Sequence, residues 1–371
     1  MKIVIAPDSF KESMSAYEAC LAIQSGIQQH HFNMETILCP LADGGEGTLE
    51  TLVNATGGKV EYYEVYGPLL QKIKAPIGYV QETAIIECAK VCGLELLEES
   101  QKNPYATSTY GLGELMNHAI NHGVKRIMIC LGGSATNDGG IGMLQALGIQ
   151  CLDQHCQQVK PTMQGLFDLH NLDVSTMNPR LKYVSIIGVC DVNNPLCGDN
   201  GATAIYGPQK GVKKEDISKI DQAMEHYALI ADEIFQYPYR QVPGTGAAGG
   251  LGYALKAFLH ADLQPGFDVV CQTLDLETKI QECDFVIVGE GKIDQQTQYG
   301  KTPYGVLKLA QKYHKKVYAF AGKVENLDIL KQLGFTHVYQ ITPNDMELSL
   351  ALKMGQDNLK QSVIVHLEDM L

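Results

Sequence analysis

Five short apolar runs in this chain are each followed by a segment that carries a carboxylate. The acidic residues in these segments are Asp8, Asp43 with Glu46, Asp138, Asp191, and Glu290 with Asp294. Continuous apolar runs suit strands that are buried on both faces. Ligands of open α/β sheets bind beyond the carboxyl ends of such strands, and carboxylates there can hold a hard cation. The pattern predicts a site for an anionic ligand together with a metal ion.

The segment Gly132–Gly140 reads GGSATNDGG and lies between an expected strand and an expected helix. Backbone amides of a glycine-rich turn at a helix start can cradle a phosphate. A turn with only a structural role seldom needs so many polar side chains between two glycine pairs. We therefore expect Ser134, Asn137 and Asp138 to contribute to ligand binding.

The tripeptide Gly300-Lys301-Thr302 resembles the end of a P-loop, but the match fails. A P-loop needs a glycine five positions before its second glycine, and Gln295 occupies that position. Thr302 is instead expected to cap a helix that has Pro303 in its first turn. Lys301 would then lie at the positive end of a helix, where it could meet a phosphate or carboxylate or remain solvated.

The segment Gly244–Gly249 matches the dinucleotide-binding pattern GxGxxG at every position. That pattern requires a preceding strand, and here Pro238 and Pro243 interrupt the preceding segment. A glycine-rich helix entry in which Gly246 and Gly249 face an anion is favoured over a nicotinamide site. The structural alternative is close helix packing through small residues.

The other acidic candidates also have structural alternatives. Glu46 could complement a helix dipole, Asp191 could act only as a cap, and Glu290 and Asp294 could form salt bridges with Lys292. No histidine lies in a glycine loop, which argues against a zinc site or histidine-based catalysis.

Composition limits the classes of function that remain. The net charge is −13, with only three arginines in 371 residues, which argues against a nucleic-acid partner. No apolar stretch approaches the roughly 18 residues that span a membrane, and the N-terminus has no signal-peptide pattern. The eleven cysteines are odd in number, lie mostly in apolar runs and fit reduced thiols. A cytoplasmic protein is the expectation.

The expected order of strands and helices indicates which domain carries each acidic or glycine-rich segment. A strand–helix rhythm occupies both ends of the chain, whereas the middle begins with an antiparallel meander over 59–89. Expected strands elsewhere are 2–6, 35–39, 126–131, 182–190, 285–288, 317–321 and 337–341. Expected helices include 15–27, 48–55, 109–122, 140–147, 214–235, 247–260, 267–283, 303–314, 327–333 and 348–371. This predicts a discontinuous parallel-sheet domain from residues 1–60 and 285–371, and an inserted domain over 61–284.

At these motifs the chain resembles the bacterial type I glycerate kinases over nearly its full length. The matching segments are 6–11, 42–48, 133–140, 190–192, 207–211, 246–252 and 289–301. Glu12 stands where many members have glycine, and Thr245 replaces a frequent small residue. The resemblance implies ATP-dependent phosphorylation of D-glycerate, giving 2-phospho-D-glycerate and ADP. It also implies a flavodoxin-like (Rossmann-like) α/β domain from both chain ends, an inserted α/β domain, and a site between the two.

Roles can be assigned under that resemblance. Mg²⁺ would be held by Asp191 and Asp43, with Glu290 or Asp294 as further ligands. Asp191 or Asp8 would take the proton of the acceptor hydroxyl, and the sequence does not separate base from metal ligand. The candidate cations for the glycerate carboxylate or the phosphates are Lys11, Lys210 and Lys301. Amides of Gly133–Gly140 and Gly246–Gly250 would hold phosphates.

Two other classes of function stay open. One is a nicotinamide-dependent oxidoreductase of a small hydroxy acid that uses Gly244–Gly249. The other is a non-catalytic metabolite-binding protein on the same scaffold. The expected partners are small molecules, D-glycerate and ATP, without nucleic acid or membrane. A homodimer is left open, as is the choice between 2- and 3-phosphoglycerate.

Overall fold

The computed structural model describes residues 1–29, 33–295, 297 and 302–371. The chain divides into two compact units, which we describe separately. The terminal unit comprises Met1–Asp43, Glu50–Gly57 and Phe267–Leu371, and the inserted unit comprises Gly44–Leu49 and Gly58–Gly266. The domain boundaries at residues 60 and 284 remain a prediction, because compactness alone does not show that a segment folds independently.

The terminal unit contains a five-stranded parallel sheet. Its strands are β1 (Lys2–Ile5), β2 (Glu35–Leu38), β11 (Phe285–Ile293), β12 (Lys316–Val324) and β13 (His337–Gln340). Their spatial order is β13-β12-β11-β1-β2, and every neighbouring pair is parallel. Renumbered within this unit, the order is the 2-1-3-4-5 of flavodoxin-like folds. The predicted α/β class and the flavodoxin-like order are therefore confirmed.

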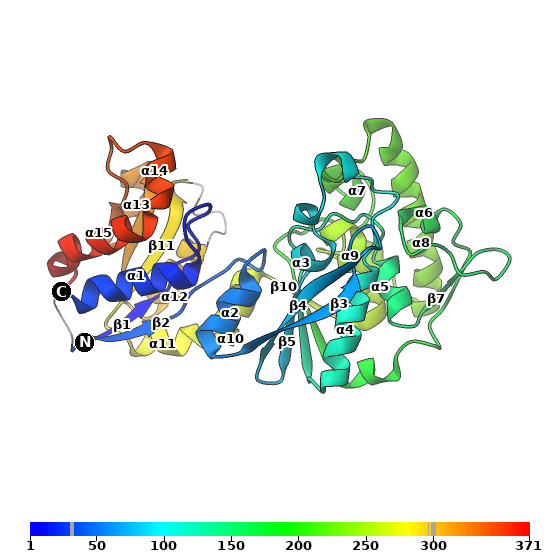
Figure 1. Cartoon of the computed structure of the whole chain (residues 1–371), viewed down its shortest axis with the longest axis horizontal. Helices are drawn as coiled ribbons and strands as arrows, with labels where there is room; N and C mark the ends of the chain where they lie inside the picture. The colour runs from blue at the N-terminus through cyan, green and yellow to red at the C-terminus, as the bar shows by residue number, and fades with distance from the viewer. Residues whose placement is uncertain (30–32, 296, 298–301) are drawn as a thin grey trace. The chain divides into compact units, whose positions relative to one another are not determined.

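Helices cover both faces of this sheet (Figure 1). The helices α1 (Ala16–Gln28) and α15 (Gly355–Met370) lie side by side, whereas α11 (Leu276–Glu282) and α12 (Thr302–Lys312) contact β1, β11 and β12. Right-handed crossovers that run in opposite directions from β1 and β11 place α1 and α12 on opposite faces. The core beneath α1 and α15 includes Ile3, Ile5, Ile23, Ile287, Phe320, Leu359 and Val363. The remaining helices of this unit are α10 (Gly266–Thr273), α13 (Leu327–Leu333) and α14 (Leu348–Lys353).

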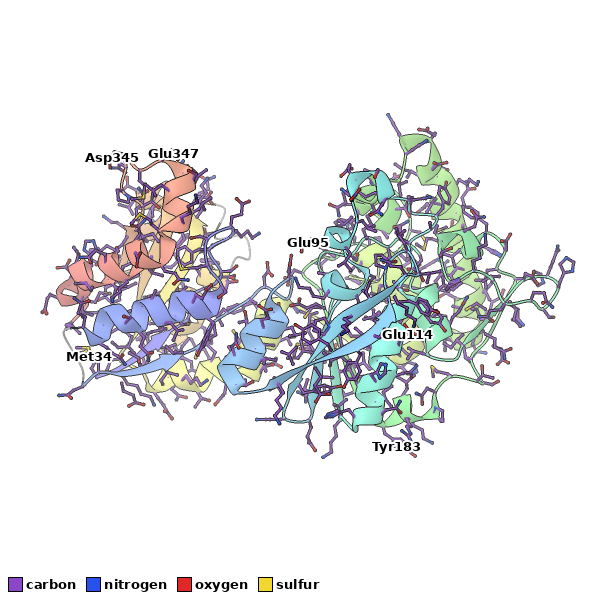
Figure 2. All side chains as sticks on the ribbon, viewed as in Figure 1. Met34, Glu95, Glu114, Tyr183, Asp345 and Glu347 are labelled. Carbon is purple, nitrogen blue, oxygen red and sulfur yellow. The ribbon has the colours of Figure 1, made fainter. Side chains whose placement is uncertain are left out.

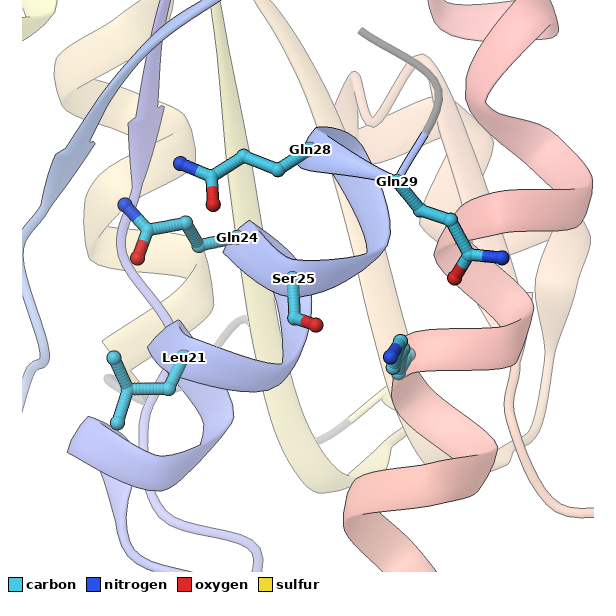
Figure 3. Close-up of a pocket in the computed structure, with 6 residues that line it drawn as sticks. Leu21, Gln24, Ser25, Gln28 and Gln29 are labelled. Atoms are coloured by element: carbon cyan, nitrogen blue, oxygen red, sulfur yellow. The ribbon is translucent and has the colours of Figure 1, made fainter. Parts of the chain in front are cut away.

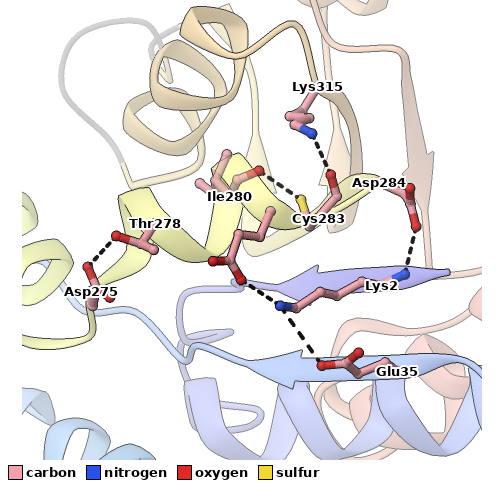
Figure 4. Close-up of polar contacts among 9 residues, drawn as sticks. Lys2, Glu35, Asp275, Thr278, Ile280, Cys283, Asp284 and Lys315 are labelled. Carbon is pink, nitrogen blue, oxygen red and sulfur yellow. Dashed lines mark hydrogen bonds and ion pairs between the residues drawn. The ribbon is translucent and has the colours of Figure 1, made fainter.

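The helix α1 begins with a capping box. The amide of Glu18 donates to the Ser15 hydroxyl over 3.2 Å, and the amide of Ser15 donates to the Glu18 carboxylate over 2.8 Å. At the amino end of the sheet, Lys2 bonds Glu282 and Asp284 over 2.8 and 2.7 Å (Figure 4). These exposed contacts hold the starts of β1 and β11, at the edge opposite the candidate site.

The inserted unit contains a mixed six-stranded sheet. Its strands are β3 (Lys59–Tyr66), β4 (Lys72–Val80), β5 (Thr83–Glu87), β6 (Arg126–Cys130), β9 (Ser185–Val189) and β10 (Asp262–Gln264). The order is β10-β9-β6-β5-β4-β3, with antiparallel pairing from β3 to β5 and parallel pairing from β5 to β10. The predicted meander is therefore confirmed, and the parallel strands bring the ends of β6 and β9 to one edge.

The helices of the inserted unit are α3 (Cys88–Cys92), α4 (Tyr110–His122), α5 (Ile141–Ala146), α6 (Met163–Leu166), α7 (Ala202–Tyr206), α8 (Ile217–Phe235) and α9 (Ala247–Leu259). The strands β7 (Gln150–Leu152) and β8 (Asn171–Asp173) form a small second sheet. Glu114 ties α4 to the meander, because it accepts the amide of Tyr66 over 2.7 Å and lies 3.7 Å from the Lys72 ammonium (Figure 2). The helix α2 (Thr48–Thr56) belongs partly to each unit.

Several expected elements have other bounds in the structure. The single helix expected over 267–283 is wrong, because the left-handed backbone of Asp275 (φ 48°) separates α10 from α11. The single helix expected over 348–371 is wrong, because Met354 leaves helical geometry (φ −97°, ψ 11°) between α14 and α15. The strand expected to end at Val288 continues to Ile293, so Glu290 and Lys292 lie in β11 and not in a loop. The segment 182–190 begins in a 3₁₀ turn, and its strand is only Ser185–Val189. Within the described ranges, no helix has the length and apolarity to cross a membrane.

Candidate active site

The polar side chains of the Gly132–Gly140 loop turn into the inserted unit. Ser134 is 4% exposed, and Asn137 and Asp138 are fully buried, whereas Gly133 is exposed. The Asp138 carboxylate accepts the amide and hydroxyl of Thr109 over 2.9 and 2.8 Å and the amide of Gly140 over 3.1 Å. Burial raises the pKa of Asp138, and the Thr109 hydrogen bonds oppose that shift. Asp138 therefore fixes this loop to the start of α4.

Lys210 lies beneath the same loop. Its ammonium donates to the Ser134 hydroxyl over 2.9 Å and to the Thr136 carbonyl over 2.8 Å, and the residue is 2% exposed. Burial lowers the pKa of Lys210 to about 8. Sequence reasoning selected Lys210 as a ligand contact, and the structure places it behind the loop.

Asn137 leaves one acceptor inside the unit. Its amide nitrogen donates to the Thr203 hydroxyl over 3.1 Å. Its oxygen Oδ1 has no hydrogen-bond partner among the described residues, and neither has the hydroxyl of Thr136. Buried polar groups normally have partners, so these two atoms mark a place for an ordered water or a ligand group.

The Gly244–Gly249 segment packs backbone against backbone. Gly246 donates its amide to the Asn194 carbonyl over 2.9 Å. Gly249 has φ +67°, and a Cβ there would lie 2.1 Å from the Thr136 carbonyl oxygen. Ala248, Gly249 and Gly250 all have left-handed backbone geometry, which kinks α9. These contacts favour the close-packing alternative, in which the glycines support the Gly132–Gly140 loop.

The segment that precedes Gly244 holds no strand. Residues 236–243 are all described and contain only a 3₁₀ turn (Tyr239–Gln241) and irregular backbone. A dinucleotide-binding GxGxxG needs the end of a strand before its first glycine. The structure therefore gives the nicotinamide alternative no support.

Asp191 marks where three backbone segments meet in the inserted unit. It is an exposed residue just beyond β9, and its carboxylate accepts the amide of Gly266 over 2.8 Å. A Cβ on Gly44 would lie 2.3 Å from the Val189 side chain and 2.9 Å from Gly266. A Cβ on Gly132 would lie 3.0 Å from Gly45. A Cβ on Gly44 would clash and one on Gly132 would be crowded, so glycine at these positions lets both loops approach the end of β9.

Glu46 belongs to an ion-pair cluster on the same unit. Its carboxylate lies 2.6 Å from the Lys90 ammonium, and it also hydrogen-bonds Glu95, which is labelled in Figure 2. The hydrogen bond from Lys90 lowers the pKa of Glu46. The start of α2 is served by Glu87, which accepts the amide of Leu49 over 2.8 Å. Glu87 is buried and distant in sequence from α2, so sequence reasoning missed it.

Asp8 lies beyond the end of β1 in the terminal unit. Its two oxygens accept the Ser9 amide over 2.6 Å and the Thr302 hydroxyl over 2.5 Å. Burial raises the pKa of Asp8, the Thr302 and Ser9 hydrogen bonds lower it, and the Asp43 charge adds to the rise. Because the chain leaves β1 and β11 in opposite directions, these strand ends form the topological switch point where α/β sheets bind ligands.

The other terminal-unit candidates lie along the same edge. Lys11 is exposed, and its backbone nitrogen would lie 3.5 Å from a Cβ on Gly291. Lys292 lies 3.1 Å from the Asp294 carboxylate and 2.9 Å from Glu325, so the salt-bridge alternative for Asp294 is present. Glu290 lies half-buried in β11. Lys301 lies outside the described residues.

Metal binding can be judged from the donor chemistry. The described residues contain no cluster of three or more His, Cys, Asp or Glu side chains with metal-site geometry. Mg²⁺ in phosphate-transferring sites commonly takes only one or two carboxylates and keeps waters and phosphate oxygens as further ligands. Asp191 is an exposed carboxylate just beyond the end of β9, and carboxylate oxygens are ligands that Mg²⁺ prefers. Asp191 therefore fits a magnesium ligand.

A surface depression lies elsewhere on the terminal unit (Figure 3). It is lined by Leu21, Gln24, Ser25, Gln28, Gln29 and Lys360, from α1, the residue that follows it and α15. It contains no carboxylate and lies on helix faces, not at strand ends. It therefore does not belong to the candidate site.

Comparison with known proteins gives consistent matches along the chain. The model of the glycerate kinase family matches residues 3–367. A glycerate kinase from Haemophilus influenzae is 45% identical over 97% of this chain and 96% of its own length. A protein from Escherichia coli named glycerate 2-kinase is 42% identical, over 97% of this chain and 95% of its own length.

A solved structure agrees with these matches. The crystal structure of the "putative glycerate kinase 2" from Salmonella typhimurium superposes with a TM-score of 0.92 at 40% identity. The alignment covers 100% of this chain and 98% of that one.

Proposed function

Because the chain belongs to the glycerate kinase family, we propose that it transfers a phosphoryl group from ATP to D-glycerate and releases 2-phospho-D-glycerate and ADP. The family match over residues 3–367 carries the proposal. The relative named glycerate 2-kinase favours the 2-phosphorylated product over the 3-phosphorylated one. Phosphoryl transfer depends mainly on positioning and charge neutralisation, which suits a site of carboxylates and glycine loops without histidine.

Asp191 is our first candidate for catalysis. It is an exposed carboxylate held at the end of a buried strand by the amide of Gly266. We assign it either to the proton of the attacking hydroxyl or to Mg²⁺, which would neutralise charge on the phosphates. Asp43, Glu290 and Asp294 remain further candidate ligands on the terminal unit. A metal ion at Asp294 would compete with its ion pair to Lys292.

Asp8 is the alternative proton acceptor. Burial raises its pKa above that of an ordinary carboxyl group and towards neutral pH, which suits a general base. The Thr302 hydroxyl and the Ser9 amide fix its orientation. Lys11 is the exposed cation nearest in sequence, and we propose that it meets the glycerate carboxylate.

In this proposal, backbone amides of the Gly132–Gly140 loop bind the phosphates. Gly133 is the exposed part of the Gly132–Gly140 loop, and Ser134, Asn137 and Asp138 shape that loop from inside. The Gly246 amide already donates to the Asn194 carbonyl, and the Gly249 carbonyl accepts the amide of Gly139, so in this proposal both glycines support the loop. Lys301 remains a candidate cation by sequence alone.

Further properties follow from the same proposal. The partners are small molecules, and no feature favours nucleic acid for a chain of net charge −13. The cysteines are thiols without described disulfides, which supports a reducing, cytoplasmic location. The protein could act as a monomer or as a homodimer, and light scattering would measure its molecular mass in solution.

The product test is ³¹P NMR of a reaction with ATP, Mg²⁺ and D-glycerate. The proposal expects the resonance of 2-phosphoglycerate together with ADP. A 3-phosphoglycerate resonance would correct the regiochemistry and leave the kinase intact. Consumption of NAD(H) with a hydroxy acid, and no phosphorylated product, would instead establish the oxidoreductase. Tight binding of D-glycerate without any product would establish a non-catalytic binding protein.

A further inference from the structure

Lys210 is a buried cation whose hydrogen-bond acceptors are both neutral. Its ammonium bonds the hydroxyl of Ser134 and the carbonyl of Thr136, on either side of Ala135. The amide of Ala135 in turn donates to the Cys92 carbonyl over 2.8 Å. This part of the Gly132–Gly140 loop is therefore hydrogen-bonded both to α3 and to the 3₁₀ turn Pro208–Lys210.

We propose that Lys210 is a positioning residue that shapes the Gly132–Gly140 loop for the phosphates of ATP and supplies positive charge behind it without touching the nucleotide. The inference rests on the proposed function. The sequence suggests that this lysine contacts the ligand directly. Under the present proposal it acts on the ligand only through the Gly132–Gly140 loop.

The cost of burying this charge supports the proposal. An ammonium inside a protein loses hydration, and neutral acceptors compensate that loss only in part. A neutral donor could hold the same two acceptors at lower cost. We therefore infer that the role of the charge is electrostatic: its positive field attracts the phosphates, and a low-dielectric interior screens that field only weakly. That field reaches the exposed backbone of Gly133, which directly precedes Ser134.

The groups around Lys210 determine the pH range in which its ammonium is charged. The titratable groups that act on it are the thiols of Cys92 and Cys88 and the carboxylate of Asp138. All three raise the pKa, but burial dominates and brings it to about 8. The charge behind the loop should therefore be lost as the pH rises through about 8.

The test compares three variants by steady-state kinetics with ATP and D-glycerate. Lys210→Met removes the charge, and Ser134→Ala removes one acceptor but keeps the charge. Lys213→Met is the matched control, because Lys213 is exposed and its replacement changes the net charge equally. We expect Lys210→Met to raise the apparent KM for ATP about tenfold, a size that fits the loss of one nearby unit charge whose field is only partly screened. In Lys210→Met the KM for D-glycerate should stay within about twofold of wild type. In Lys213→Met the KM values for both substrates should stay within the same range.

The pH profile supplies a readout that a purely structural role would not change. In the wild-type enzyme kcat/KM for ATP should fall as the pH rises through about 8, and this fall should be absent in Lys210→Met. An unchanged KM for ATP together with a persistent alkaline fall would overturn the proposal. So would a rise in the KM for D-glycerate alone.

Two measurements keep the test decisive if Lys210→Met does not fold. The wild-type profile must still show the alkaline fall, and Ser134→Ala must raise the KM for ATP about threefold, as expected for one weakened hydrogen bond. Failure of both contradicts the role of Lys210. A wild-type enzyme that forms no ADP with D-glycerate refutes the proposed function instead, so the two failures are distinguishable.

Discussion

The hydroxyl of Thr302 donates a 2.5 Å hydrogen bond to Oδ2 of Asp8. Thr302 is the first residue of α12 and Asp8 follows β1, so the bond joins residues 294 positions apart at the switch point of the terminal sheet. It holds the Asp8 carboxylate in one orientation and also opposes the rise of its pKa that burial causes.

Replacing Thr302 with Val should move the acidic limb of the rate profile to higher pH. Asp8 acts as a base only when it is ionised, and the Thr302 hydrogen bond favours the ionised form. Without that bond the pKa of Asp8 rises further, so activity is lost at a higher pH on acidification. The measurement is kcat against pH for wild type, Thr302→Val and Thr302→Ser, which keeps the hydroxyl. Superimposable acidic limbs in all three would exclude Asp8 from the protonation that controls the rate.

The sequence supports the architecture better than the site. The apolar runs that end in carboxylates predict parallel strands in both sheets, because buried strands need continuous apolar residues. The break between α14 and α15 is not predictable in this way. It lies at Met354, and the next residue, Gly355, packs against a distant segment, where a Cβ would lie only 2.0 Å from the Ser13 hydroxyl.

Gly44→Ala should destabilise the protein more than Gly47→Ala. The two glycines have nearly equal φ angles, +84° and +86°, so the strain of a left-handed alanine, about 1–2 kcal/mol, is common to both. Only the Gly44 Cβ meets other atoms, at 2.3 Å from Val189, and this overpacking should add about 1–3 kcal/mol to the loss. Urea unfolding of both variants measures the difference. Equal losses would mean that the loop does not pack against β9 in solution.

Lys11→Ala should raise the apparent KM for D-glycerate about tenfold and that for ATP much less. The exposed ammonium is proposed to meet the glycerate carboxylate, and such charge-assisted bonds are worth about that factor. Lys331→Ala is the control, since Lys331 is an exposed lysine on α13 of the same unit. Initial rates with each substrate varied in turn provide both constants. An unchanged KM for D-glycerate would refute this role.

Residue types identify candidates but do not show which way a side chain points. Ser134, Asn137, Asp138 and Lys210 are polar residues near glycines, and such residues often meet a ligand. In the structure all four are buried, because loops at buried strand ends need internal hydrogen-bond partners. Glu87, which serves the start of α2, has no local signal because its partner Leu49 lies 38 residues away.

Asp191→Asn should lower kcat by about 10²-fold or more, as expected for a positioned acid–base group or metal ligand. The asparagine oxygen can still accept the amide of Gly266, so the fold should be retained. Circular dichroism and urea unfolding provide the control for folding. A folded variant with near-normal turnover would remove Asp191 from the mechanism.

The most direct measurement is ADP release by the purified protein with ATP and Mg²⁺, with and without D-glycerate, alongside quantification of phosphoglycerate. We expect ADP and phosphoglycerate to form in equal amounts, and only when D-glycerate is present. ADP release that does not respond to D-glycerate, or no release at all, would contradict the assignment of this chain as an ATP-dependent glycerate kinase.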